Sequence, residues 1–580
     1  MNIDERAFYY ATLMTMPLDE SRTTEAAPMR VPPYITRRSS IIIGCAGFAI
    51  AACWWPFRMR FPFDDTYITF RYAANIAHGF GIVWNPGGPH TEGYTNFLYV
   101  LLLAPFSALG LDLVVVAQAI NVLAVITSAI AVGRLILKDS PGRSSSESPK
   151  PKLSSSILGA AFFLLDPFTW FNAHSGMETS LFTMWVVLVV ATAGRPLLPF
   201  VFATLASLTR PEGALFGVIL LAAKILQDRS ASKVSGTGGA RESRGGQANL
   251  RNAFYVFGLP LALYAVWKYS YFGNLLPNSF YVKVAQPQGP DVGKLPGLGT
   301  LFRAYAGMWI IVVLAALAWL RVCIRDRRVP SVMLIPTAWI VLLSIFYLFS
   351  HLIQPEYQRF TNSIEAMLIV LAGVAFQRYR NRASAAIFLG LLACHIAWSI
   401  YFRGGLSYFL RTNEYLSCYT RVASVLRTIP DHEKISLAWG DAGRIPYFAG
   451  LQHIDPIGLN TTAIAHAHSA EEVIRFIMQS RPDLIVIPLN LPHLGADTAT
   501  DNPCRLIIRM GDGPIGRSYP ALEAAAVANA YQPIVMIPQT VYDLDVFADT
   551  RSPHYHDIVQ TLVPRIGHDS DFLPVPDCLR

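Results

Sequence analysis

Two adjacent carboxylates, Asp64 and Asp65, open a polar stretch that directly follows an apolar run. The same stretch contains Arg71, Glu92 and Tyr94. A carboxylate can take a proton from a hydroxyl group, and a nearby guanidinium can hold an anionic group. Paired acids with an arginine and a glutamate at the end of an apolar run therefore predict a polar site at a membrane surface.

Further polar residues recur between later apolar runs. Glu178 lies in "WFNAHSGMETSLF", Arg210 in "LTRPEG", Asn278 and Lys283 in "NLLPNSFYVK", and Arg359 in "HLIQPEYQRF". Ionisable groups near the hydrocarbon boundary are costly unless they are paired or solvated, so several of them on different segments predict one shared site. Arg359, Lys283 and Arg210 are candidates for binding a phosphate. Glu178 and Asn278 join Arg71, Glu92 and Tyr94 as candidate substrate contacts.

Several of these residues also have a purely structural interpretation. One of the two aspartates can act as the N-cap of a helix predicted over Thr66–His78, although a helix N-terminus also favours the charged form that a proton acceptor needs. Arg210–Gly213 can be a turn with an exposed ion pair, and Lys283 can extend from the membrane interface to water. His174 is expected to be a structural or rim residue. The roles therefore remain open at this point.

The composition predicts a polytopic α-helical membrane protein. Of the 580 residues, 53% are hydrophobic and only 15% are charged, which is far more apolar than a soluble domain of this length requires. The net charge of +8 comes with basic residues in short loops between apolar runs. This pattern reports topology and argues against a nucleic-acid partner.

Arg37 and Arg38 precede the first apolar run, Ser39–Trp55, so the positive-inside rule places the N-terminus in the cytoplasm. The run Phe97–Leu109 is too short to cross a hydrocarbon core of about 30 Å and is expected at the outer interface. Counting the other runs gives about eleven spans. The expected domains are a cytoplasmic tail (1–38), a transmembrane domain (39–402) with its first external loop (58–111), and an external domain (403–580).

The C-terminal segment alternates strand-like runs with a helical run at Ala470–Gln479, which predicts a small α/β domain. Trp439, Asp441 and Tyr447 have side chains suited to aromatic and polar contacts with a ligand. Alternatively, Asp441 forms a turn and Tyr447 packs on the membrane domain. An oxidising compartment would permit one disulfide, with the pair left open, among Cys418, Cys504 and Cys578.

Five strings occur in order along the chain: "DDTYITFRYAANIAHGFGIVWNPG…EGYTN", "SGMETSLF", "LTRPEG", "NLLPNSFYVK" and "GDAGRIPYFAGLQHIDPIGL". Together they resemble the GT-C superfamily of polyprenyl-phosphate-dependent glycosyltransferases, and within it the branch that contains the mycobacterial terminal arabinofuranosyltransferase. The resemblance runs from Phe63 to about Ile487. Each string alone is weak, and the specificity comes from their number and order.

The resemblance implies that the catalytic residue is the aspartate of the first external loop, here Asp64 or Asp65. It also implies a polyprenyl monophosphate sugar as donor, presented from the outer leaflet of a bacterial inner membrane. The carboxylate would take the acceptor's proton while the sugar leaves its phosphate, whose growing charge needs a cation. Because basic candidates are present, Mg²⁺ or Mn²⁺ is not required, but Asp64, Asp65 and Glu178 offer oxygen ligands for one.

The expected function is transfer of a sugar, arabinofuranose by resemblance, to a cell-envelope polysaccharide on the outer face of the membrane. Trp439, Asp441 and Tyr447 of the external domain are the candidates for contacting this acceptor glycan. Two alternatives stay open: transfer of another sugar to a protein such as a pilin or to lipopolysaccharide, and a flippase or transporter of lipid-linked sugars. Against a transporter, Asp166, Lys268 and Glu365 lie toward the outer ends of their spans, and only His395 lies near the middle of one.

Overall fold

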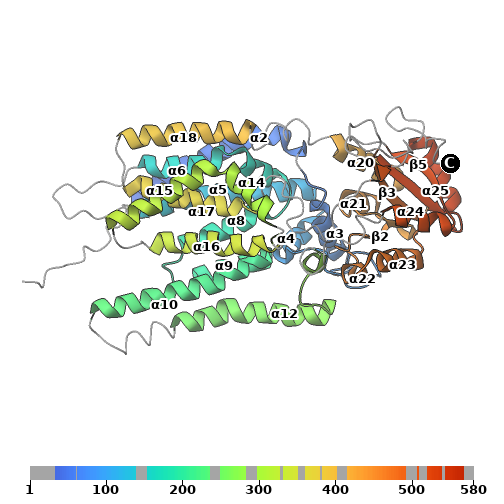
Figure 1. Ribbon diagram of the computed structural model, residues 1–580, viewed down its shortest axis with the longest axis horizontal. Helices are drawn as coiled ribbons and strands as arrows, with labels where there is room; N and C mark the ends of the chain where they lie inside the picture. Colours follow the sequence, from blue (N-terminus) through green and yellow to red (C-terminus); the bar gives the residue numbers. More distant parts are fainter. Residues whose placement is uncertain are drawn as a thin grey trace, which may run out of the picture.

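The computed structural model describes residues 33–60, 62–138, 153–235, 248–282, 295, 297–326, 331–350, 359–378, 382–401, 414–490, 506–507, 519–537 and 543–566. Within these ranges the chain forms an elongated bundle of apolar helices and an α/β domain at one end of the bundle (Figure 1). The two helices α3 and α4 lie between them (Figure 1).

Each long apolar run of the sequence contains a helix of the bundle. Helix α5 packs against α2, α6 and α8, and α17 packs against α15 and α16. In the core, the Phe216 ring stacks on Trp339 with centroids 4.1 Å apart. The helices are α2 (Pro33–Trp54), α5 (Leu113–Lys138), α6 (Leu153–Leu165), α7 (Pro167–His174), α8 (Thr179–Ala191), α9 (Leu198–Thr209), η2 (Pro211–Ala214), α10 (Leu215–Ser235), η3 (Ala253–Gly258), α12 (Leu259–Phe272), α13 (Asn278–Phe280), α14 (Leu298–Gly307), α15 (Trp309–Asp326), α16 (Ser331–Leu348), α17 (Asn362–Arg378) and α18 (Arg382–Tyr401).

Length and apolar composition alone identify few of these helices as membrane spans. Among the described residues, two helices, Thr36–Arg58 and Leu113–Leu137, are long and apolar enough to cross a membrane. Counting each of two bent pairs as one span, α7 with α8 and α14 with α15, raises the number to four. Most of the remaining helices are apolar but shorter, so the predicted number of crossings stays a prediction.

The first loop between α2 and α5 contains η1 (Trp55–Arg60), α3 (Thr66–Ala77) and α4 (Phe97–Ala108). Helix α3 confirms the helix predicted over Thr66–His78. It ends where Gly79 adopts a φ of 81°, a conformation that residues with a Cβ rarely tolerate. Nine of its residues are buried, because it packs against α4 on one side and α21 on another.

A six-stranded mixed sheet forms the centre of the C-terminal domain. The strand order is β2-β1-β3-β6-β5, with β4 paired to β3; β1 runs parallel to β2 and β3, whereas β6 is antiparallel to β3 and β5. The strands are β1 (Ser436–Ala438), β2 (Gln452–Ile454), β3 (Leu484–Asn490), β4 (Leu506–Ile507), β5 (Tyr531–Ile537) and β6 (Asp543–Asp549). The helices are α20 (Glu414–Leu426), η6 (His432–Lys434), α21 (Arg444–Ala449), α22 (Thr462–Ala465), α23 (Ala470–Ser480), α24 (Tyr519–Ala528) and α25 (Tyr555–Ile566).

Strand β3 begins with a continuous apolar run because both of its faces are covered there. Leu484 and Val486 belong to one hydrophobic cluster, whereas Ile485 and Ile487 belong to the other, as the alternation of side chains along a strand requires. The predicted helix at Ala470–Gln479 is confirmed by α23, whose Ser469 side chain accepts a hydrogen bond from the Glu472 amide.

The predicted disulfide cannot be placed on this structure. Cys504 and Cys578 lie outside the described residues, as does the side chain of Cys418. Four described cysteines, Cys45, Cys53, Cys323 and Cys394, are free thiols.

Candidate active site

A pocket lies where the first loop meets one end of the helix bundle. Its walls come from segments far apart in the sequence: α3, the Gly93–Asn96 segment, the turn before α8, the η2 turn, the end of α16 and the residues before α17. The ionisable residues that line it are Asp65, Glu178, Arg210, Glu212, Tyr94, Tyr347 and Arg359. Ionisable side chains from several segments therefore line one pocket, and its use as a functional site stays a prediction.

Asp65 and Arg359 face each other in this pocket. One Asp65 carboxylate oxygen, Oδ2, lies 3.3 Å from Arg359 Nη1. The Arg359 guanidinium also lies over the Phe360 ring, 4.8 Å from its centroid, which fixes the plane of the fork. A proton acceptor and a permanent cation thus share one wall of the pocket.

Arg210 forms a buried ion-pair network beside them. Its guanidinium lies 3.0 Å from Glu178 Oε1 and 2.6 Å from Glu212 Oε1, and Tyr347 donates its hydroxyl to the same Glu212 oxygen. The predicted turn and its ion pair are present, but the expectation that the ion pair is exposed is wrong, because the Arg210 and Glu212 side chains are only 9% and 7% exposed. With two carboxylates already beside it, Arg210 is better suited to holding the pocket wall than to capturing an anion.

The sequence reasoning missed two neutral residues of this network. Asn96 donates to Glu178 Oε2 at 2.8 Å and to the Thr69 hydroxyl at 3.0 Å. These bonds connect α3 with the turn before α8. Asn96 belongs to the string "EGYTN", but a neutral amide carries no charge pattern that would have singled it out.

Asp64 has different partners from its neighbour. Its carboxylate accepts hydrogen bonds from the Gly443 amide at 2.9 Å and the Arg444 amide at 2.8 Å, both in the C-terminal domain. Burial, followed by the negative charge of Asp441, raises the pKa of Asp64 to about 7. Asp64 does not line the pocket, and its geometry makes it a link between the two domains.

The N-capping interpretation is confirmed for the position of Asp65, but not for the carboxylate of either aspartate. Asp65 occupies the N-cap position of α3, but its side chain makes no capping hydrogen bond. The Asp64 carboxylate is held by the Gly443 and Arg444 amides instead of the first turn of α3. Neither carboxylate is therefore used to begin the helix.

Arg71 and Glu92 were predicted as substrate contacts, but neither lines the pocket. Both side chains are buried and contact other parts of the protein. Arg71 donates to the carbonyl oxygens of Trp84 and Leu451 at 2.9 and 2.7 Å, and also to that of Pro446. Glu92 forms an ion pair with Lys268 at 2.8 Å. Burial raises the pKa of Glu92 to about 7, although Lys268 opposes this shift.

Of the other predicted substrate contacts, Tyr94 and Glu178 line the pocket. Asn278 lies beside it: its neighbours Pro277 and Ser279 line the wall, while its own side chain donates to the Thr462 hydroxyl at 3.3 Å. Lys283 lies outside the described residues.

The three acceptor-binding candidates lie within or between the domains. Trp439 is 3% exposed and packs against Tyr419 in the C-terminal core, and the Tyr419 hydroxyl donates to Asp441. Tyr447 packs against Tyr67 of α3, with ring centroids 5.4 Å apart. The alternative that Tyr447 packs on the membrane domain matches this contact, and acceptor binding by these residues stays a prediction.

His174 is fully buried, and its Nδ1 lies 2.9 Å from the Trp170 carbonyl oxygen. This position fits the structural role that was expected.

Asp64, Asp65 and Glu178 were predicted as possible ligands of one metal ion. Among the described residues, these three side chains do not form a group whose ligand atoms lie close enough together to hold one ion. The Asp64 oxygens already accept two amide hydrogens, and the Glu178 oxygens contact Arg210 and Asn96.

Comparisons with known proteins place the fold. Residues 410–549 match a family model described as a domain of unknown function, DUF8728. No curated protein matches the sequence. Two similar solved structures are the apo oligosaccharyltransferase of Archaeoglobus fulgidus (13% identity, TM-score 0.50, 92% of this chain and 78% of that one) and apo ArnT of Cupriavidus metallidurans (12% identity, TM-score 0.51, 86% and 97%).

A further similar structure is the mycobacterial arabinofuranosyltransferase AftD, with 14% identity and a TM-score of 0.48; the match covers 90% of this chain but only 42% of that one. At sequence identities this low, the similarity is evidence about the fold and not about the activity. The chain therefore shares its overall fold with the oligosaccharyltransferase and ArnT.

Proposed function

We propose that this protein is a membrane glycosyltransferase that moves a sugar from a polyprenyl-phosphate donor to a cell-envelope polysaccharide on the outer face of the inner membrane. The observation that carries the proposal is the Asp65–Arg359 pair in the pocket, 3.3 Å apart. Transfer from a lipid phosphate needs a base for the acceptor and a cation for the leaving group, and these two residues supply both. The GT-C fold supports the same reaction class.

In the proposed reaction, the Asp65 carboxylate takes the proton of an acceptor hydroxyl. The acceptor oxygen forms a bond to the anomeric carbon of the sugar as the bond from that carbon to the phosphate oxygen breaks. The polyprenyl phosphate leaves with the electron pair of the broken bond, and Arg359 stabilises its added charge. Because Asp65 and Arg359 already contact each other, incoming phosphate would compete for the guanidinium and release the carboxylate for the acceptor.

The finer features of the proposal come from the sequence strings. We propose arabinofuranose as the sugar, the first loop and the C-terminal domain on the external side, and the N-terminus in the cytoplasm, as the positive-inside rule indicates. The Asp64–Gly443 and Arg71–Leu451 contacts support a C-terminal domain on the same side as the pocket. We propose no resident metal at the pocket.

The test uses the purified full-length protein in liposomes with a labelled polyprenyl-phosphate arabinofuranose and an arabinan oligosaccharide. A longer labelled oligosaccharide is the expected product. Parallel reactions with other polyprenyl-phosphate sugars, pilin or lipopolysaccharide decide between transferase alternatives. Movement of labelled donor across the liposome without any new glycosidic bond would contradict the proposal and favour a flippase.

A further inference from the structure

Three ionisable side chains meet inside the helix bundle, away from the pocket. Asp166 precedes α7, Glu365 lies in the first turn of α17, and His395 lies on α18. Their exposed fractions are 0%, 1% and 0%. The ligand atoms of the three residues lie within 4.8 Å of one another. None of the three lines the pocket, and the proposed reaction uses none of them.

The distances between His395 Nε2 and the two carboxylate oxygens are longer than hydrogen bonds and fit ligands arranged around one metal ion. His395 Nε2 lies 3.6 Å from Asp166 Oδ1 and 3.5 Å from Glu365 Oε1, beyond the usual range of about 2.7–3.2 Å for N–H···O bonds. Neither ring nitrogen of His395 has a hydrogen-bond partner among the described residues. Ligands at about 2.1 Å from a tetrahedral Zn²⁺ are separated by about 3.4 Å.

The neighbours of Asp166 hold its carboxylate in place. Ser399 donates its hydroxyl to Asp166 Oδ1 at 2.8 Å, and the Thr169 amide donates to Oδ2 at 3.2 Å. Such outer hydrogen bonds orient carboxylate ligands in metal sites. The Phe162 ring lies 5.9 Å from the His395 ring, so the imidazole also has an apolar wall.

From this geometry we propose that Asp166, Glu365 and His395 form a binding site for one divalent transition-metal ion, with Zn²⁺ as the first candidate. Two carboxylates buried in an apolar bundle are costly to desolvate, and a divalent cation balances both of their charges at once. An imidazole ligand favours Zn²⁺ or a neighbouring transition metal over Mg²⁺ and Ca²⁺, which prefer oxygen.

The site would be structural. It joins α7, α17 and α18, and all three of its ligands are buried, which is the pattern of closed metal sites. Arg359 lies just before α17, so an ion bound to Glu365 would also help to fix the end of the helix that presents the pocket's cation.

The first test is the metal content of the full-length protein, purified without chelators and then incubated with ZnCl₂ or CoCl₂. Wild type is expected to hold about one equivalent of metal, whereas Glu365→Gln and His395→Gln each hold less than a tenth of that. Asp545→Asn, which neutralises a buried carboxylate in the C-terminal domain, is the matched control and keeps the metal. Asp65→Asn also keeps it, which separates this site from any ion in the pocket.

Cobalt supplies a readout that does not depend on variants. Wild type loaded with Co²⁺ is expected to show the visible absorption of a tetrahedral nitrogen–oxygen site, and added Zn²⁺ abolishes it. Removing the ion with a chelator is expected to lower the thermal midpoint. Wild type that binds neither metal would overturn the proposal and leave a cluster that shares protons only. Retention of the ion by both cluster variants, or its loss in Asp65→Asn, would also overturn it.

Discussion

Asp64 and Asp65 are adjacent in the sequence, yet their carboxylates serve different parts of the molecule. Asp64 accepts the amide hydrogens of Gly443 and Arg444 from the C-terminal domain, whereas Asp65 lies 3.3 Å from Arg359 in the pocket. One aspartate therefore holds the two domains together, and its neighbour is positioned for chemistry. The predictions below follow from this division.

Gly443→Ala is expected to weaken the contact between the domains. A Cβ at Gly443 would overlap the Asp64 carbonyl oxygen and carboxylate, so one side must shift, at a cost of about 1–3 kcal/mol. The measurement is the thermal midpoint of the full-length protein in detergent. Gly299→Ala is the control, because a Cβ there meets nothing within 4 Å. Equal midpoints for the two variants would contradict the assigned contact.

Arg71→Met is expected to weaken the attachment of the C-terminal domain to the first loop. The change leaves the buried carbonyl oxygens of Trp84, Pro446 and Leu451 without their donor, and each unsatisfied group costs about 1–3 kcal/mol. Limited proteolysis of the full-length protein is expected to release C-terminal fragments faster than in wild type. Arg427→Met, which changes an exposed arginine of the same domain, is expected to be cleaved at the wild-type rate.

Arg359→Ala is expected to raise the donor KM at least tenfold while the acceptor KM stays nearly constant. The guanidinium is proposed to bind the donor phosphate, and hydrogen bonds to charged groups are worth about 1.5–3 kcal/mol. Initial rates measured at varied donor and varied acceptor concentrations separate the two constants. Arg303→Ala, an exposed arginine on α14, serves as control. A rise confined to the acceptor KM would remove Arg359 from the donor site.

The stability of the protein is expected to depend on the titration of Asp64. Its pKa is about 7 in the folded protein and about 4 when unfolded. Between these pH values the folded chain holds a proton that the unfolded chain has released, so the free energy of unfolding falls as the pH rises from 4 to 7. Thermal midpoints measured between pH 5 and 8 are expected to show a shallower slope for Asp64→Asn than for wild type. Parallel slopes would show that Asp64 does not titrate in this range.

The sequence predicted the elements that carry strong local patterns. Helix α23 has a capping serine and acidic residues in its first turn, and α3 ends at a glycine with positive φ. The strand-like runs that were predicted in the C-terminal segment include the short apolar run that forms β3. Such signals act within a few residues, so they can be read without knowing the fold.

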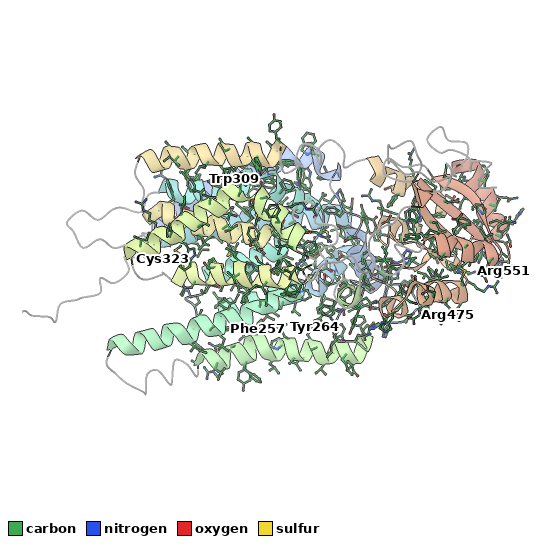
Figure 2. The ribbon with its side chains drawn as sticks, in the orientation of Figure 1. Phe257, Tyr264, Trp309, Cys323, Arg475 and Arg551 are labelled. Atoms are coloured by element: carbon green, nitrogen blue, oxygen red, sulfur yellow. The ribbon has the colours of Figure 1, made fainter. Side chains whose placement is uncertain are left out.

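The division between the two aspartates could not be read from the sequence. Gly443 lies 379 positions after Asp64, and only the fold shows that its amide meets that carboxylate. Glu92 was predicted as a substrate contact for the same reason: its charge is visible in the sequence, but its partner Lys268 is on another element. Figure 2 shows the labelled Tyr264 of the same helix, α12, closer to the C-terminal domain than Phe257.

The most direct test of the account compares Asp65→Asn with Asp64→Asn in the liposome transfer assay, with folding of each variant checked by its thermal midpoint. If Asp65 is the base, its replacement lowers kcat by about 10²–10⁴-fold, whereas Asp64→Asn lowers the midpoint and keeps kcat within about tenfold of wild type. A folded Asp65→Asn enzyme with the wild-type kcat, or a loss of kcat confined to Asp64→Asn, would contradict the assignment.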